Sequence, residues 1–214
     1  MNLIYFADPL CSWCYGFGPE LAKLLHAHPE ATLEIVMGGL RPFNRELVTP
    51  EFRATLRGHW DHVAEASGLP FSGAALEIPG FAYDTEPACR AVVAARAIEP
   101  AGALGCMKAI QAAFYRDGRD VTQAEVLAEV AEEAGYARAP FQAHMDSEAG
   151  RRSTLADFQR SQSLGVRGFP TLALARDSQL FLVTSGFVPA DILEDRVEAI
   201  AHAPAAGPGL AGNK

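Results

Sequence analysis

Short apolar runs and a helical segment alternate at the start of the 214-residue chain. Residues 2–7 and 32–36 are rich in Leu, Ile, Val and aromatic side chains, a pattern typical of buried strands. Between them, residues 12–28 carry leucines at helical spacing, and Pro19 predicts a kink or a restart of that helix. Strand, helix and strand in this order predict a βαβ unit with parallel strands and a right-handed crossover.

Helical patterns fill the middle of the chain, from about residue 50 to residue 163. Pro87 suits the first turn of an alanine-rich helix, because that turn needs no backbone N–H from it. Thr122, followed three residues later by Glu125, predicts a capping box at the start of a further helix, which Gly135 would end.

Strand patterns return only near the end of the chain. Residues 171–174 and 180–183 are apolar runs separated by the polar segment 176–179, which predicts a β-hairpin. A last helix is expected over 190–202. Residues 203–214 are rich in Pro, Gly and Ala, a composition that favours a disordered tail.

Composition and charge narrow the class of protein. Hydrophobic residues make up 49% and charged residues 21% of the chain, which is typical of a folded core. The formal charge of −8 argues against a nucleic-acid-binding surface, which needs clustered Lys and Arg. No run approaches the roughly 20 apolar residues of a membrane span, and the first residues lack the basic start of a signal peptide. We therefore expect a cytoplasmic protein that binds neither nucleic acid nor membrane.

Two cysteines separated by two residues, Cys11 and Cys14, follow the first predicted strand and open the first predicted helix. Unpaired backbone N–H groups and the dipole at a helix N-terminus favour a thiolate there, and Cys11 is the nearer of the two thiols. A strand, a CxxC and a helix in this order are typical of a redox motif. A structural zinc site needs four ligands, and the chain has no second CxxC, so redox chemistry is favoured over zinc binding.

The other two cysteines, Cys89 and Cys106, lie in predicted helical segments among Ala, Val and Ile. Free cysteine is often a small buried hydrophobe, so inert core thiols are favoured over a second redox pair or a disulfide. The role of this pair stays open.

Several further residues have two interpretations each. Trp13 lies between the two thiols, where a partly exposed apolar rim for substrate is favoured over simple packing. Arg41 follows the second predicted strand and could equally border the site or belong to an ordinary connection. His59 and His62 lie three residues apart, a spacing that suits one helix face, but without a nearby carboxylate cluster a surface position is favoured over a metal site.

Two segments resemble motifs of the DsbA-like family of thioredoxin-fold proteins. The first is the run Asp8-Pro9-Leu10-Cys11-Ser12-Trp13-Cys14-Tyr15-Gly16-Phe17, which is similar to the motif of a cytoplasmic, FrnE-like branch of predicted protein disulfide isomerases. The second is the run Gly165-Val166-Arg167-Gly168-Phe169-Pro170-Thr171, which resembles the family's loop before the third strand. The two motifs together are more specific than either alone, and the resemblance extends from residue 2 to about residue 202.

The resemblance implies an α/β fold of the thioredoxin type with a helical domain inserted between the βαβ half and the β-hairpin–α half. Residues 1–45 and 164–202 would form the thioredoxin-like domain, and residues 46–163 the inserted domain. By the same resemblance the Phe169–Pro170 bond is cis, and its loop packs against the CxxC. Phe169 would then pair with an extended substrate backbone, while Trp13 and Pro170 help to orient the substrate.

The implied activity is that of a thiol–disulfide oxidoreductase, similar to protein disulfide isomerases, acting on a protein or small-molecule thiol or disulfide. Cys11 would attack the substrate disulfide and Cys14 would resolve the mixed disulfide. No metal or organic cofactor is expected, and glutathione or thioredoxin would serve as redox partner. Where the best-known oxidising members carry Pro-His, this chain has Ser12-Trp13, which removes a cation beside the thiolate and predicts a weaker oxidant.

Two alternatives keep the fold and change the function. One is a glutathione-dependent transferase or isomerase of the kappa-class or hydroxychromene-carboxylate isomerase type, although those proteins typically use a serine where this chain has Cys11. The other is a non-catalytic binding module. The direction of exchange, the reduction potential, the physiological substrate and the oligomeric state stay open at this level.

Overall fold

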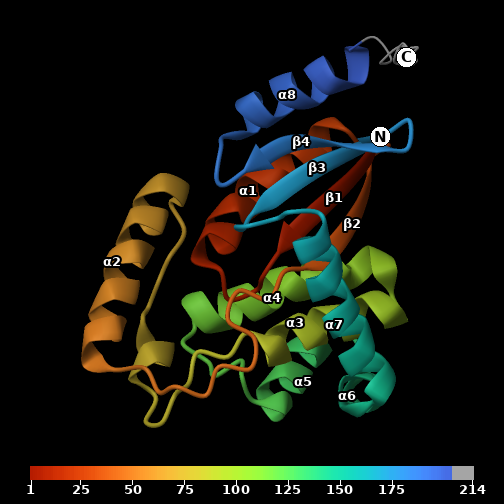
Figure 1. The fold of residues 1–214 in the computed structure, drawn as a ribbon. Coiled ribbons are helices and arrows are strands. Elements are labelled where there is room, and N and C mark those ends of the chain that lie inside the picture. Colours follow the sequence, from red (N-terminus) through yellow and green to blue (C-terminus); the bar gives the residue numbers. More distant parts are fainter. Residues whose placement is uncertain (204–214) are drawn as a thin grey trace, which may run out of the picture.

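The computed structural model describes residues 1–203, which form a four-stranded sheet with helices around it (Figure 1). The strands are β1 (Asn2–Ala7), β2 (Thr32–Met37), β3 (Thr171–Arg176) and β4 (Gln179–Ser185), in the spatial order β2-β1-β3-β4. β1 and β2 are parallel, and β1–β3 and β3–β4 are antiparallel. The predicted βαβ unit, the hairpin and the α/β fold class are therefore confirmed.

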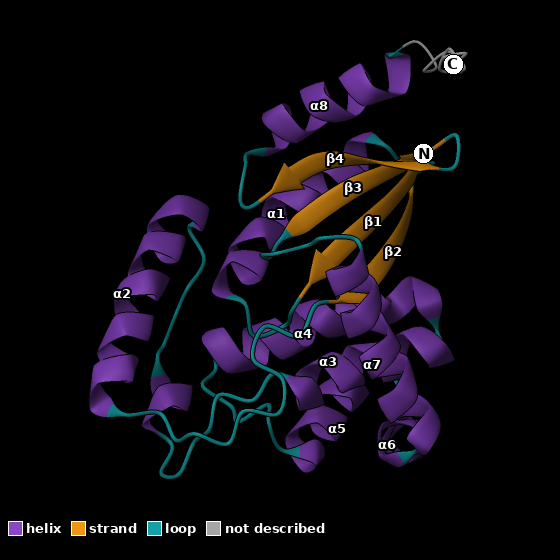
Figure 2. Cartoon of the chain, viewed as in Figure 1, coloured by secondary structure: helices purple, strands orange, loops and turns teal. Residues whose placement is uncertain are grey.

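Helices α2 to α7 all follow β2 and precede β3, so the helical block interrupts the sheet in sequence (Figure 2). The helices are α1 (Ser12–Ala27), α2 (Pro50–Ser67), α3 (Glu86–Ile98), α4 (Ala103–Tyr115), α5 (Ala124–Glu133), α6 (Arg138–Asp146), α7 (Glu148–Ser163) and α8 (Ala190–His202), with 3-10 turns at Ala74–Glu77 and Pro100–Gly102. The predicted tail, 203–214, lies outside the described residues except for residue 203.

Two local predictions need correction. The capping box at Thr122 is wrong, because α5 begins at Ala124 and its N-cap residue is Gln123. The backbone N–H and the hydroxyl of Thr122 both donate to the Asp120 carboxylate, at 3.0 and 2.6 Å, and so hold a turn before the helix. Of the two alternatives predicted at Pro19, the restart is wrong, because α1 continues through Pro19, and the kink stays a prediction.

The core is continuous between the sheet and the helical block. Side chains alternate along β1, and one set enters a large cluster shared with α1, α3, α4 and α5, whereas the other set enters a small cluster on the opposite face. The first set is Leu3, Tyr5 and Ala7, and the second is Ile4 and Phe6. The division into two domains at residues 45/46 and 163/164 stays a prediction.

α7 lies beside β2 and ties the helical block to this edge of the sheet (Figure 1). The Asp157 carboxylate accepts from the backbone N–H of Met37 at 2.9 Å and from the Arg96 guanidinium at 2.8 and 3.0 Å. Arg160 pairs with Glu34 on β2 itself. These contacts hold the end of β2 against α7 and so fix the point at which the following loop begins.

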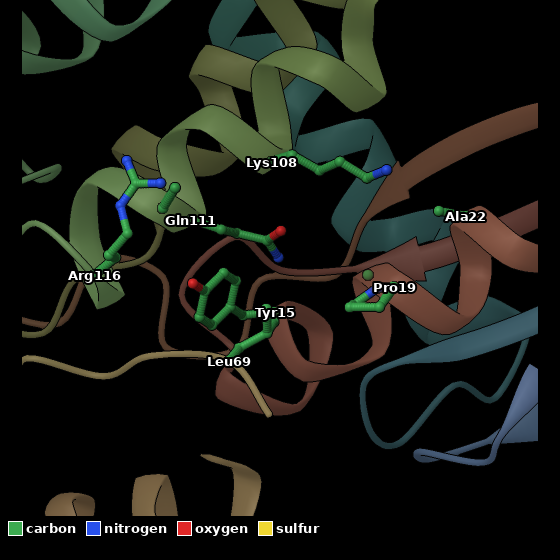
Figure 3. Close-up of a pocket in the computed structure, with 9 residues that line it drawn as sticks. Tyr15, Pro19, Ala22, Leu69, Lys108, Gln111 and Arg116 are labelled. Atoms are coloured by element: carbon green, nitrogen blue, oxygen red, sulfur yellow. The ribbon is translucent and has the colours of Figure 1, made fainter. Parts of the chain in front are cut away.

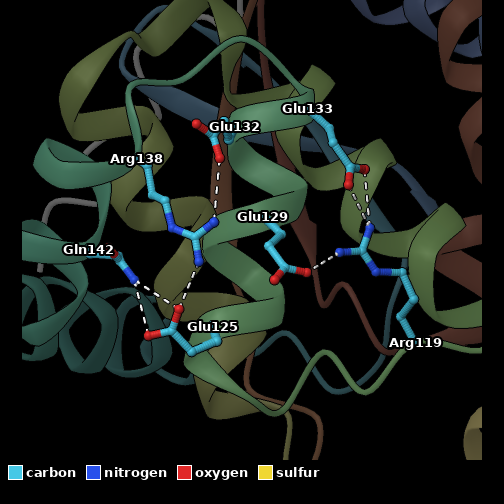
Figure 4. A network of polar contacts seen from close by, with 7 residues as sticks. All are labelled: Arg119, Glu125, Glu129, Glu132, Glu133, Arg138 and Gln142. Carbon is cyan, nitrogen blue, oxygen red and sulfur yellow. Dashed lines mark hydrogen bonds and ion pairs between the residues drawn. The ribbon is translucent and has the colours of Figure 1, made fainter.

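The charged face of α5 and α6 carries a network of exposed ion pairs (Figure 4). Arg119 binds Glu129 and Glu133, at 2.9 and 3.0 Å, and Arg138 binds Glu125 at 2.7 Å. Exposed pairs of this kind contribute only about 0–1 kcal/mol each. Among residues 1–203, no helix has the length and apolar character needed to cross a membrane.

Candidate active site

The CxxC lies where β1 gives way to α1. Cys11 is the residue before the helix, with an extended backbone, and Cys14 lies in the first turn. Both cysteines are free thiols, and both are buried, with 6% of Cys11 and none of Cys14 exposed. Cys11 is therefore the more accessible of the two thiols, and it faces a cavity in the protein.

Burial changes the acidity of the Cys14 thiol. It raises the pKa of Cys14 well above the usual value, and the neighbouring Cys11 thiol adds to the rise. Cys14 therefore holds its proton in the resting dithiol, while Cys11 stands before the unpaired N–H groups at the start of α1.

The loop before β3 meets the CxxC across 158 residues of sequence. The Phe169–Pro170 bond is cis, as predicted, and the Cys11 thiol donates to the carbonyl oxygen of Phe169 at 3.4 Å. The Phe169 ring lies over Gly38, where an added Cβ would come within 1.9 Å of the ring. Two of the three predicted substrate-orienting residues, Phe169 and Pro170, thus form the loop that contacts Cys11, and the carbonyl of Phe169 accepts from the thiol.

A cavity of about 430 Å³ opens beside Cys11. It is bounded by the CxxC, the Phe169 loop, the loop after β2 and one side of α2, and its lining includes Trp13, Arg41, Phe52, His59, Trp60 and Tyr83. Trp13 is partly exposed and packs against Phe187, at 5.7 Å between ring centroids. Trp13 and Arg41, whose roles were left open, both border the site, and His59, which is exposed as predicted, borders it as well.

A buried carboxylate lies under the CxxC loop. Asp8 accepts from the backbone N–H groups of Leu10 and Leu40, at 2.9 and 2.6 Å, and from the Cys89 thiol at 3.4 Å. Burial raises the pKa of Asp8, and the two backbone N–H groups oppose the rise. The sequence offered a signal for this residue, a carboxylate directly after an apolar strand, but its partners are distant in sequence.

Three buried tyrosines lie in the neighbourhood of the CxxC: Tyr5, Tyr83 and Tyr115. Tyr83 donates to the carbonyl of Leu10 at 2.6 Å and lies 3.4 Å from the hydroxyl of Tyr115. The Tyr5 hydroxyl is buried without a hydrogen-bond partner among the described residues, and burial together with Cys14 raises its pKa. None of the three carried a sequence signal, because aromatic residues at these positions read as ordinary core.

The remaining cysteines lie apart from the exchange chemistry. Cys89 and Cys106 are both fully buried and are not bonded to each other. Burial raises the pKa of Cys106 to about 12, and burial together with Asp8 raises that of Cys89. Protonated thiols are poor nucleophiles, so both fit the inert role favoured from the sequence.

A second cavity, of about 310 Å³, lies between α1 and α4 (Figure 3). Its lining includes Tyr15, Pro19, Lys108, Gln111 and Arg116, and none of its lining residues is a cysteine. Cys11 therefore lines the cavity beside Arg41 and not this one, and Cys14 lines neither.

Comparison with known proteins agrees with this arrangement. The family model of DSBA-like thioredoxin domains matches residues 2–198, which is nearly all of the described chain. The chain belongs to this family. Membership covers both the CxxC and the Phe169–Pro170 loop, and it agrees with the thiol–disulfide oxidoreductase predicted from the sequence.

Two solved structures are similar to the chain over its whole length. A candidate protein disulfide isomerase from Nitrosomonas europaea is 35% identical, with a TM-score of 0.86, and the match covers 95% of this chain and 98% of that one. The cytosolic disulfide reductase DsbM from Pseudomonas aeruginosa is 28% identical, with a TM-score of 0.78 and coverage of 94% and 98%. DsbM is also known in a structure with glutathione, to which this chain is 27% identical with a TM-score of 0.77, covering 94% of this chain and 98% of that one.

One curated relative is more distant. The ClpXP adapter protein SpxH from Halalkalibacterium halodurans is 24% identical over 184 residues, which cover 83% of this chain and 60% of the relative. The chain thus spans 60% of the length of the curated relative that it matches.

Proposed function

We propose that the protein is a thiol–disulfide oxidoreductase that cycles between the Cys11–Cys14 dithiol and its disulfide. One observation carries the proposal: the more accessible thiol stands at a helix N-terminus and contacts the carbonyl of Phe169, before cis Pro170, at 3.4 Å. Cys11, as a thiolate, attacks one sulfur of a substrate disulfide. A bond forms between Cys11 and that sulfur, and the other half of the substrate leaves as a thiolate that takes up a proton.

Cys14 completes the cycle. Its thiol is buried and its pKa is raised, so it stays protonated while Cys11 reacts. Once the mixed disulfide has formed, Cys14 loses its proton and attacks the Cys11 sulfur. The second half of the substrate leaves as a thiol, two electrons have passed to the substrate, and Cys11 and Cys14 share a disulfide.

The Phe169–Pro170 loop would hold the substrate during these steps. The Phe169 carbonyl that accepts from the Cys11 thiol becomes available to a backbone N–H of an extended substrate once Cys11 has reacted. Pro170 has no N–H to compete for that partner. Trp13, partly exposed against Phe187, gives the substrate an apolar surface on the other side.

We further propose that the protein works as a reductase or isomerase in the cytoplasm. The similarity to DsbM, a cytosolic disulfide reductase, supports this direction, as does the absence of a histidine between Cys11 and Cys14. Glutathione or a thioredoxin would return the disulfide to the dithiol. The sulfur chemistry is complete without a metal or an organic cofactor.

Insulin reduction and refolding of scrambled ribonuclease test the proposal. We expect Cys11→Ser to abolish both activities, Cys14→Ser to accumulate a mixed disulfide, and the control Cys106→Ser to retain both. Wild-type protein that is inactive in both assays but binds glutathione tightly would favour the transferase or isomerase alternative. Inactivity without glutathione binding would favour a binding module.

The reduction potential of the Cys11–Cys14 pair, measured by equilibration with glutathione, tests the direction of exchange. A reductase should lie near the thioredoxin value of about −270 mV, and about 30 mV shifts the equilibrium tenfold. A value near the −120 mV of strong oxidants would contradict the reductase proposal.

A further inference from the structure

The cavity beside Cys11 has an unusual balance of charge for so acidic a protein. Although the chain carries a formal charge of −8, the residues that line this cavity include no Asp or Glu. Arg41 and His59 are its basic side chains, and the rest of the lining is apolar or uncharged apart from Cys11. The volume of about 430 Å³ is in the range of pockets that bind small molecules.

Arg41 is held in place but lacks an anionic partner. Its backbone N–H donates to the Thr85 hydroxyl at 3.1 Å, and its carbonyl accepts from the Thr85 N–H at 3.2 Å, so the loop is fixed to the start of α3. The guanidinium lies over the Phe52 ring, 4.6 Å from the centroid. Among residues 1–203, no carboxylate pairs with it, whereas Arg53 and Arg57 on nearby α2 both bind Glu77.

A guanidinium stacked on a ring keeps its N–H edge available, and that edge matches a carboxylate as a two-pronged donor. We infer that Arg41 anchors a carboxylate of a small, peptide-like disulfide while a sulfur of the same molecule meets Cys11. This inference rests on the proposed function and names its substrate class: low-molecular-weight disulfides that carry carboxylates, of which oxidised glutathione is the available probe.

The reaction that tests it is a single turnover. Pre-reduced protein passes two electrons from the Cys11–Cys14 dithiol to the disulfide, which leaves as two thiols, so no further reductant is needed. Oxidised glutathione, with two carboxylates on each half, is compared with bis(2-hydroxyethyl) disulfide, which carries no charge. The measured quantity is the second-order rate constant of protein oxidation, followed by the fluorescence of Trp13 and Trp60, which both line the cavity.

Three variants make the comparison specific. Arg41→Gln removes the charge, and we expect the ratio of the two rate constants, glutathione over the uncharged disulfide, to fall about tenfold or more, as the loss of a charge-assisted hydrogen bond predicts. Arg41→Lys keeps the charge but lacks the planar, two-pronged guanidinium. Its ratio of rate constants should therefore lie between those of wild type and Arg41→Gln. Arg45→Gln makes the same change of charge at an exposed residue outside this cavity and should leave the ratio within about twofold of wild type.

A binding measurement separates this inference from the proposed function. S-methylglutathione cannot undergo exchange, so calorimetry reports its Kd whether or not the protein is redox-active. We expect Arg41→Gln to raise that Kd about tenfold. An unchanged ratio and Kd in Arg41→Gln, or an equal loss in Arg45→Gln, would overturn the role of Arg41. If neither disulfide oxidises the wild-type protein, the proposed function is refuted. The Kd values for S-methylglutathione would then be the only test of the role of Arg41.

Discussion

Gly38, the residue after β2, is required by the ring of Phe169. A Cβ at position 38 would stand 1.9 Å from the ring, far inside contact distance. The same Phe169 contacts Cys11 through its carbonyl, so a single close approach links the end of β2 to the position of the loop beside the thiol.

We expect Gly38→Ala to displace the Phe169 ring, to lower the rate of insulin reduction and to cost about 1–3 kcal/mol of unfolding free energy, as overpacking does. Chemical denaturation and insulin turnover measure both effects. In a Phe169→Ala background, Gly38→Ala should lower the unfolding free energy only slightly, because the ring that the added Cβ would meet is absent. Gly18→Ala, where a Cβ meets nothing within 4 Å, is the control. Equal costs of Gly38→Ala in both backgrounds would show that the ring is not the cause.

Asp8 makes stability depend on pH. Because its pKa is raised in the folded protein, the folded state holds a proton that the unfolded state releases, and this contribution to stability is lost as the pH rises from about 4 through the raised pKa. The unfolding free energy of wild type minus that of Asp8→Asn should therefore fall across this window, by about 1.4 kcal/mol for each unit of raised pKa. Denaturant titrations at several pH values measure the difference, and a difference that stays constant across the window would contradict the raised pKa.

At the scale of elements, one carboxylate joins three of them. Asp157 on α7 binds Arg96 on α3 and the last N–H of β2, and only 7% of it is exposed. The helical pattern that extends to about residue 163 predicted helical structure here, but an Asp in a charged segment gave no reason to expect a buried partner.

We expect Asp157→Ala to cost about 3 kcal/mol of unfolding free energy, since Arg96 and the Met37 N–H lose a buried partner together. Asp157→Asn, which keeps an acceptor, should cost less. Glu148→Ala breaks the exposed pair with Arg152 at 3.2 Å on the same helix and should cost less than about 1 kcal/mol. Denaturation of the three variants measures the order, and a loss in Asp157→Ala no larger than in Glu148→Ala would contradict the buried role.

At the scale of the whole molecule, an aromatic cluster joins the helical block to the CxxC helix. Tyr115 on α4 stacks on Tyr15 of α1 at 5.0 Å between centroids and meets Trp60 of α2 at 5.0 Å. Together with the shared core, this packing buries apolar surface between the two predicted domains.

The two tryptophans report on the two predicted domains separately, because Trp13 lies on α1 and Trp60 on α2. We expect Trp13→Phe and Trp60→Phe, each with one tryptophan left, to unfold in urea with midpoints within about 0.2 M of their own far-UV circular dichroism transitions. Separate fluorescence and dichroism midpoints would instead indicate that the inserted helices form an independent domain.

The strands could be predicted from the sequence more reliably than the ends of the helices. The strands were predictable because each is a short run that must be buried, and β3 and β4 merely extend beyond the expected ranges to a two-residue turn at Asp177 and Ser178. The start of α5 could not be predicted from the capping pattern. The hydroxyl of Thr122 donates to the carboxylate of Asp120, a local partner that the pattern does not include.

What the sequence determined by itself was local chemistry: a CxxC between a strand and a helix, and a Phe-Pro segment that resembles a known loop. Periodicity and motifs act over a few residues, so they suffice for such features. Only the tertiary structure decided what gathers around this motif: the Phe169 carbonyl contacts the Cys11 thiol, the Leu40 N–H contacts the Asp8 carboxylate, and Arg41 lines the cavity beside Cys11. Their positions follow from packing between segments far apart in the chain, which no local pattern records.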